Sequence, residues 1–271
     1  MNEFIYFNGA FISPTGAKIP AASSTALYGR GIFTTLAVYG GQPFLWDKHW
    51  RRLANNAVTI GIDLAEHTEN STRKALSEII EKNGVADGRA RITFFDERPS
   101  SIWPSESDKK TSLHIMTGDR RPVSGNFRLT ISPYPVNSRS PLAGVKSCNY
   151  LENLLAYDEA KGRGFDEAIR VNERGEVTSA VMANIFWLKD NVLFTPSLKT
   201  GCLAGTTREF MLEKMECAEV EAEIEVLNEA DAIFLTSTGV GVVSVNEFNG
   251  RILANTSHPI TQLIPVTRDA G

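Results

Sequence analysis

The chain has 271 residues, of which 42% are hydrophobic and 22% are charged, and its formal net charge is −4. A chain of this length can bury a large core in one large domain or in two medium ones. The negative charge excludes a global basic field for nucleic acid or an anionic membrane surface. No apolar run approaches the roughly 20 residues that a membrane span needs, so we expect neither kind of partner.

Three cysteines without a CxxC pair predict neither a disulfide framework nor a zinc site, and we expect no metal. The first residues, Met1-Asn2-Glu3, lack the basic and apolar regions of a signal peptide. Together these features favour a reducing, cytoplasmic setting.

The first part of the chain combines short strand patterns with two amphipathic helices. The expected strands cover 4–7, 10–13, 32–39, 90–95 and 112–117, and the expected helices cover 46–60 and about 72–83. Charged residues, Pro and Gly then cluster in 118–126, which is typical of a linker. We therefore predict two α/β-type domains in an α+β protein, a small one in 1–119 and a larger one in 120–271.

The second part continues with strands, hairpins and two further helices. The expected elements are a strand over 127–132, a helix over 151–160, hairpins over 168–178 and 184–195, a helix over 206–217, and strands over 232–236 and 242–245. No internal repeat or low-complexity tract interrupts this order.

One lysine stands out by its place in this order. Lys146 ends an extended segment punctuated by prolines and directly precedes the apolar helix that begins near Leu151. Flanking apolar residues can partly bury such a lysine, and desolvation lowers the pKa of an ammonium and frees the nucleophilic amine. Lys146 is therefore a candidate for a Schiff-base amine.

Three polar clusters offer binding groups for an anion. Thr206 and Thr207 follow a glycine at a helix start, where backbone N–H groups and hydroxyls can bind a phosphate, although a simple helix cap has the same pattern. Hydroxyl groups also gather in Thr236-Ser237-Thr238 at the end of a strand. The early helix carries the adjacent arginines Arg51 and Arg52, of which one can face inward.

The order and spacing of these residues resemble a known family, the class IV (fold type IV) pyridoxal-phosphate enzymes. This family contains branched-chain and D-amino-acid aminotransferases and 4-amino-4-deoxychorismate lyases. The matching motifs are Asn8-Gly9, Tyr28-Gly29-Arg30-Gly31-Ile32-Phe33, His49-x-x-Arg52-Leu53, Lys146-x-x-Asn149-Tyr150-Leu151, Val177-Thr178-x5-Asn184-Ile185-Phe186, Gly205-Thr206-Thr207-Arg208, Thr236-Ser237-Thr238 and Asn249-Gly250-Arg251. The resemblance covers nearly the whole chain and implies a small α/β domain followed by a larger, β-barrel-like α/β domain that carries the lysine.

The resemblance also implies roles for individual residues. Lys146 is the catalytic residue and forms the Schiff base with pyridoxal 5'-phosphate. The residues implied in cofactor binding are Arg52, Thr206, Thr207 and Thr238 for the phosphate, Tyr150 near the phenolic oxygen, and Ser179 at the position next to the pyridine nitrogen. A homodimer is implied as well.

The sequence departs from the family pattern at several positions. Family members carry a glutamate five residues before Asn184, where this chain has Ser179, and a serine cannot hold a full positive charge on the pyridine nitrogen. Arg30 stands where an acidic residue is common. Arg98 could bind a substrate carboxylate, but its neighbours Asp96 and Glu97 also favour a surface salt-bridge cluster.

Three functions remain open on these residues. The first is an aminotransferase acting on an amino acid and a 2-keto acid, in which Lys146 moves a proton between Cα and the cofactor. The second is the lyase that releases pyruvate and 4-aminobenzoate, which Phe33-Thr34-Thr35 favours because aminotransferases commonly have Phe-Glu there. The third is a protein of the same fold with weak or lost turnover, which Ser179 and Arg30 favour.

Overall fold

The computed structural model describes residues 2–99, 110–120, 122–254 and 258–264. The chain forms two compact units, each with its own core. The first unit contains Met1–Arg120 together with Val145–Asn149, and the second contains Arg121–Gly144 and Tyr150–Gly271.

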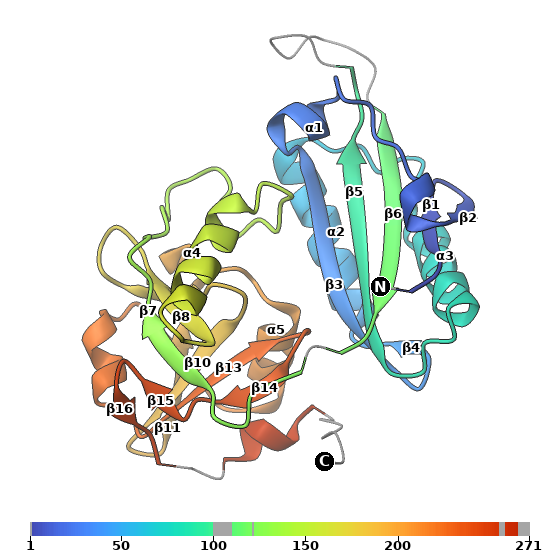
Figure 1. Cartoon of the computed structure of the whole chain (residues 1–271). Coiled ribbons are helices and arrows are strands. Elements are labelled where there is room, and N and C mark those ends of the chain that lie inside the picture. Colours follow the sequence, from blue (N-terminus) through green and yellow to red (C-terminus); the bar gives the residue numbers. More distant parts are fainter. Residues whose placement is uncertain (1, 100–109, 121, 255–257, 265–271) are drawn as a thin grey trace. The chain divides into compact units, whose positions relative to one another are not determined.

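The first unit is built on a six-stranded antiparallel sheet (Figure 1). Its strand order is β2-β1-β6-β5-β3-β4. The strands are β1 (Ile5–Phe7), β2 (Ala10–Ile12), β3 (Gly31–Tyr39), β4 (Gln42–Pro43), β5 (Gly88–Asp96) and β6 (Thr111–Gly118). The helices are α1 (Ser24–Tyr28), α2 (Trp46–Ile60) and α3 (Glu69–Lys82), and η1 (Pro14–Gly16) is a short 3-10 helix.

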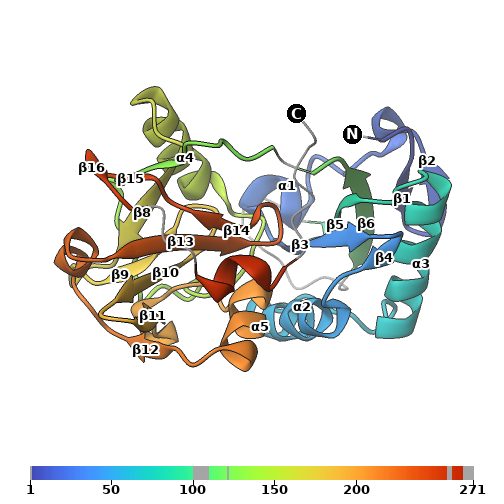
Figure 2. The same ribbon diagram turned by 90° about the horizontal axis from the view of Figure 1, so that it is seen from below.

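Helices α2 and α3 cover one face of this sheet (Figures 1 and 2). Every second residue of β3 and β5, including Ile32, Leu36 and Ile92, is buried there against the apolar stripes of the two helices. The alternate residues of these strands, such as Phe33 and Arg91, therefore lie on the other face. Both faces concern the candidate site, since Thr34 belongs to the helix-covered set and Arg91 lies on the second face.

The segment Val145–Asn149 belongs to the first unit because it pairs with the beginning of β3. Ser147 forms a bridge with Ile32, and the Cys148 N–H donates to Gly31 O at 2.8 Å. Only glycine fits at position 31, since a Cβ there would lie 2.8 Å from Cys148 Sγ and 2.9 Å from Phe94 O. The sequence placed Lys146 in the C-terminal domain, and this long-range pairing, which no local pattern encodes, groups it with the N-terminal unit instead.

The second unit contains two five-stranded sheets. Their orders are β12-β11-β10-β13-β14 and β16-β15-β7-β8-β9. The strands are β7 (Arg128–Ile131), β8 (Glu167–Val171), β9 (Val177–Ala180), β10 (Asn184–Lys189), β11 (Val192–Pro196), β12 (Ala218–Val220), β13 (Ala232–Ser237), β14 (Gly241–Ser244), β15 (Glu247–Phe248) and β16 (Arg251–Ile252). The helices are α4 (Leu151–Gly162) and α5 (Thr206–Lys214), and the 3-10 helices are η2 (Leu198–Thr200), η3 (Ile224–Asn228) and η4 (Pro259–Gln262).

Apolar residues of both sheets form one core in this unit. Leu129 and Ile169 from one sheet and Trp187 and Leu235 from the other belong to the same buried cluster. Helix α4 packs on β8 and helix α5 packs on β13 (Figure 1). The mixed architecture confirms the predicted α+β class.

None of the helices in the described ranges combines the length and hydrophobicity that a bilayer span requires.

Candidate functional site

Lys146 is fixed by the backbone of β3. The Phe33 N–H donates to Lys146 O at 3.0 Å, so Lys146 lies across from Phe33 on the neighbouring chain segment. Cross-strand partners share a face of the sheet. The lysine side chain accordingly contacts the Phe33 ring, with Nζ at 4.5 Å from the ring centroid. The lysine is thus held on the face of the sheet opposite to α2 and α3.

Two arginines surround the amine with positive charge. The Arg91 guanidinium stacks on the same Phe33 ring at 3.6 Å from its centroid, and the charge of Arg52, on α2, also acts on the amine. Burial, followed by the charges of Arg52 and Arg91, lowers the pKa of Lys146 to about 7. A substantial fraction of the amine is therefore neutral near pH 7, as nucleophilic attack requires.

Arg52 is joined to a buried hydrogen-bond network. Its NH2 group donates to Thr34 Oγ1 at 2.8 Å, and the same oxygen lies 2.6 Å from His49 Nδ1. Thr34 and His49 are both buried, on β3 and α2 respectively. Burial, the Arg52 charge and the Lys146 charge hold the pKa of His49 well below its usual range. His49 is consequently a neutral imidazole at physiological pH.

The beginning of α5 forms the polar centre of the second unit. Its N-cap residue is Gly205, whose backbone is extended and which provides no side-chain cap for the first turn. Thr206 and Thr207 are buried in that turn. A Cβ at position 205 would overlap Asn184 Oδ1, while the Asn184 amide donates to Leu203 O at 2.9 Å. The glycine thus lets β10 and the start of α5 approach closely, and the first-turn N–H groups are of the type that binds anions.

The other predicted residues of the second unit lie on different elements. Thr238 lies in the turn between β13 and β14, and Thr236 precedes it at the end of β13, opposite Asn184 of β10. The Thr236 hydroxyl is buried and has no hydrogen-bond partner among the described residues. Ser179 lies on β9 opposite Arg170, and Tyr150 is the N-cap residue of α4; both are partly exposed.

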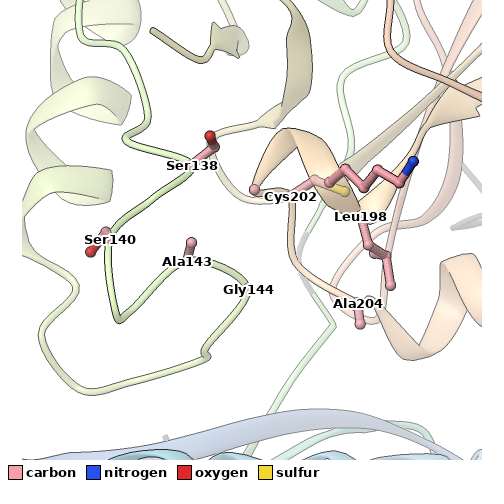
Figure 3. Close-up of a pocket in the computed structure, with 9 residues that line it drawn as sticks. Ser138, Ser140, Ala143, Gly144, Leu198, Cys202 and Ala204 are labelled. Carbon is pink, nitrogen blue, oxygen red and sulfur yellow. The ribbon is translucent and has the colours of Figure 1, made fainter.

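A pocket of about 450 Å3 lies between two loops of this unit (Figure 3). Ser138, Ser140, Ala143 and Gly144 line it on one loop, and Leu198, Cys202 and Ala204 line it on the other. The turn between β8 and β9 ties the loops together, since Arg174 donates both to Ser138 Oγ at 3.1 Å and to Lys199 O at 3.4 Å. The second loop continues directly into the start of α5.

Arg30 and Arg98 form a structural cluster around Asp96. Arg98 binds the buried Asp96 carboxylate through Nε, and its NH2 group lies 2.8 Å from Oδ2. Arg30 pairs with the same carboxylate at 3.3 Å and donates to Ile60 O at the end of α2. Of the two interpretations of Arg98, the salt-bridge cluster is therefore the one that the contacts support.

Sequence reasoning did not single out Arg91. The sequence does contain a clue to it, because Arg91 is a charged residue within the otherwise apolar strand pattern Ala90-Arg91-Ile92.

No group of three or more His, Cys, Asp or Glu side chains that could hold a metal ion occurs in the part of the chain that the structure describes. All three cysteines are free thiols.

Comparison with known proteins identifies the family. The model of the class IV aminotransferases matches residues 31–248. The aminodeoxychorismate lyase of Bacillus subtilis is 28% identical over 88% of this chain and 84% of its own length. A D-alanine aminotransferase of Staphylococcus epidermidis is 25% identical over 91% and 89%. The crystal structure of a branched-chain aminotransferase from Thermoproteus uzoniensis with norvaline superposes with a TM-score of 0.88, at 28% identity, over 97% of this chain and 92% of that one.

The chain belongs to the class IV aminotransferase family, and it has the fold type IV architecture. It is a pyridoxal-phosphate-dependent enzyme of the group that contains aminotransferases and the related lyases. The residues present suit this cofactor. The Lys146 amine has a lowered pKa, as a Schiff-base lysine needs, and the start of α5 has no side-chain cap and suits a phosphate.

Proposed function

We propose that the protein transfers an amino group between an amino acid and a 2-keto acid, with Lys146 as the catalytic residue. The observation that carries the proposal is the Lys146 amine, which is fixed on β3 and has a pKa of about 7. When bound, pyridoxal phosphate withdraws electron density from the substrate Cα. Lys146 would hold the cofactor covalently and then move the proton at Cα as a general acid and base.

The remaining site residues would orient the cofactor. Arg52 would bind the phosphate through charge-assisted hydrogen bonds, and Thr206, Thr207 and Thr238 would add hydroxyl and backbone donors from the second unit. Tyr150 and Ser179 would lie near the ring. A serine at 179 supplies no carboxylate to a ring nitrogen, so we expect the electron withdrawal to be weaker than with a glutamate there.

The test is amino-group transfer by the purified protein loaded with pyridoxal phosphate. L- and D-amino acids would be offered with pyruvate or 2-oxoglutarate, and the keto acid formed from each donor would be measured. We expect transfer with at least one donor and its loss in Lys146→Ala. Lys74→Ala, a substitution of an exposed lysine on α3 of the same unit, is the matched control. A loaded protein that transfers no amino group would contradict the proposal.

The lyase reaction is the second candidate, and one feature of the chain favours it. The residue after Phe33 is Thr34, where aminotransferases of this family commonly have a glutamate. The same preparation would therefore be given aminodeoxychorismate without an amino acceptor. Release of 4-aminobenzoate and pyruvate would select the lyase. Bound cofactor with turnover in neither assay would select the third candidate, a protein with lost turnover.

We infer that the enzyme is a cytoplasmic homodimer. The family resemblance supports the dimer, and α4 carries three exposed leucines, Leu151, Leu154 and Leu155, that a second copy would cover. The three free thiols suit a reducing compartment. Sedimentation equilibrium of the loaded protein tests the dimer, and a mass of one chain at micromolar concentration would contradict it.

A further inference from the structure

Thr34 lies at the centre of a three-residue network within the first unit. Its hydroxyl oxygen accepts a hydrogen bond from Arg52 NH2 at 2.8 Å and lies 2.6 Å from His49 Nδ1. Thr34 is fully buried and His49 is 1% exposed. His49 and Arg52 are three residues apart on α2, so they share one face of that helix and both face β3.

The hydrogen positions in this network follow from its chemistry. Arg52 can only donate, so its contact uses a lone pair of the Thr34 oxygen. The hydroxyl hydrogen then needs an acceptor, and among the described residues His49 Nδ1 is the one in reach. His49 Nδ1 must in that case be unprotonated, with its proton on Nε2. This agrees with a pKa of His49 well below its usual range, caused first by burial and then by the charges of Arg52 and Lys146.

We propose that Thr34 is a positioning residue that fixes the Arg52 side chain in the conformation that binds the phosphate of the cofactor. This inference rests on the proposed function. Threonine is β-branched and restricted in χ1, and here it is anchored on a buried strand, so its hydroxyl is a rigid acceptor. Arginine loses rotamer entropy when its side chain is ordered. Ordering it before the ligand arrives reduces the cost of binding.

The charge of the network supports the same role. Thr34 is uncharged and His49 is neutral, so these two partners orient Arg52 without neutralising it. A carboxylate at position 34 would order the guanidinium equally well but would offset its charge toward an anion. A hydroxyl in contact with a neutral imidazole therefore does not itself offset the attraction of Arg52 for a phosphate.

The experiment compares two ligands that differ only in the phosphate. Dissociation constants of pyridoxal phosphate and of pyridoxal would be measured by absorbance for the full-length wild type, Thr34→Val, Thr34→Ser and Thr72→Val. Thr72 is a fully buried threonine on α3 whose hydroxyl has no hydrogen-bond partner among the described residues, so Thr72→Val controls for the loss of a buried hydroxyl.

We expect Thr34→Val to weaken pyridoxal phosphate binding about tenfold, which corresponds to roughly 1.4 kcal/mol. The dissociation constant of pyridoxal, which has no phosphate for Arg52 to bind, should stay within about twofold of the wild-type value.

Rescue of binding by Thr34→Ser and the tautomer of His49 provide two further readouts. Thr34→Ser keeps the hydroxyl and should restore binding, and Thr72→Val should leave both dissociation constants unchanged. Nitrogen NMR of the unliganded wild type should show His49 with its proton on Nε2, and Thr34→Val should change that signal. Equal weakening for both ligands, or no weakening for either, would overturn the role of Thr34 and leave the proposed function intact. A wild type that binds neither ligand would overturn both.

Discussion

The reactivity of Lys146 depends on which residues share its face of the sheet. The Phe33 ring contacts both Lys146 and Arg91, and the charge of Arg52 on α2 adds to that of Arg91. The π face of Phe33 favours the charged ammonium, but burial and the two guanidinium groups favour the neutral amine. The lowered pKa means that the second influence is stronger.

This balance predicts the pH dependence of cofactor capture. An ordinary lysine, with a pKa of about 10.4, is almost wholly protonated at neutral pH, whereas Lys146 is half neutral at about pH 7. The rate at which the cofactor-free protein reacts with pyridoxal phosphate should therefore rise through pH 7 and level off above it. Arg91→Met removes a repulsive charge and should move the midpoint to higher pH, while Arg91→Lys should keep it. A midpoint above pH 9 in the wild type would contradict this assignment.

The same shift has a defined sign for stability. Between pH 7 and the ordinary lysine pKa, the unfolded chain binds a proton that the folded chain has released. Lys146 therefore makes the free energy of unfolding of the cofactor-free protein rise with pH across this window. Below pH 7 both states are protonated at this group, and its contribution no longer changes.

The identity of residue 179 should affect the protonation of the ring nitrogen of the cofactor. Ser179→Glu would place a carboxylate where the ring nitrogen is expected, and a nearby carboxylate favours the protonated nitrogen. We expect the nitrogen NMR signal of isotope-labelled cofactor to move toward that of the protonated form. Ser124→Glu adds the same charge on an exposed loop of the same unit and should leave the signal unchanged. An unmoved signal in Ser179→Glu would mean that position 179 does not face the nitrogen.

At the scale of elements, the start of α5 depends on how closely it approaches β10. Gly205 leaves no room for a side chain because Asn184 occupies the space. Gly205→Ala would displace Asn184 and break its hydrogen bond to Leu203 O, and Ala is also a poorer N-cap than Gly. We expect a loss of about 2 kcal/mol in the free energy of unfolding, measured with urea. Gly125→Ala, at a position with open space around it, should cost less than about 0.5 kcal/mol. Equal stability of the two variants would contradict the close packing.

At the scale of the whole molecule, binding of the cofactor to the native protein should change its stability. A ligand that binds only the folded protein stabilises it by roughly 2.7 kcal/mol at a hundredfold excess over its dissociation constant. Removing pyridoxal phosphate should therefore lower the unfolding temperature measured by calorimetry, and adding it back should restore that temperature. Lys146→Ala should show a smaller response because the covalent attachment is lost. A cofactor-free wild type with an unchanged unfolding temperature would contradict cofactor binding by the native protein.

Local patterns predicted most elements with small errors. The periodicity and turn residues around α2 placed it at 46–60, which is where it lies. Helix α3 begins at Glu69, earlier than the expected 72, because Thr68 caps it and accepts from the Ser71 N–H. Helix α5 ends at Lys214 instead of 217, since Met215 already has an extended backbone. Such boundaries depend on caps and single dihedral angles, which hydrophobic spacing does not encode.

The sequence by itself determined the order of elements, the family, the single prominent lysine and the polar turns, because these depend on local spacing and on residue type. Only the tertiary structure decided that Val145–Asn149 pairs with β3, that Arg98 is committed to Asp96, and that Thr34 joins His49 to Arg52. It also brought Arg91 to Phe33 and Lys146. The physical reason is that the pKa of a lysine and the conformation of an arginine depend on side chains supplied by segments far apart in the chain.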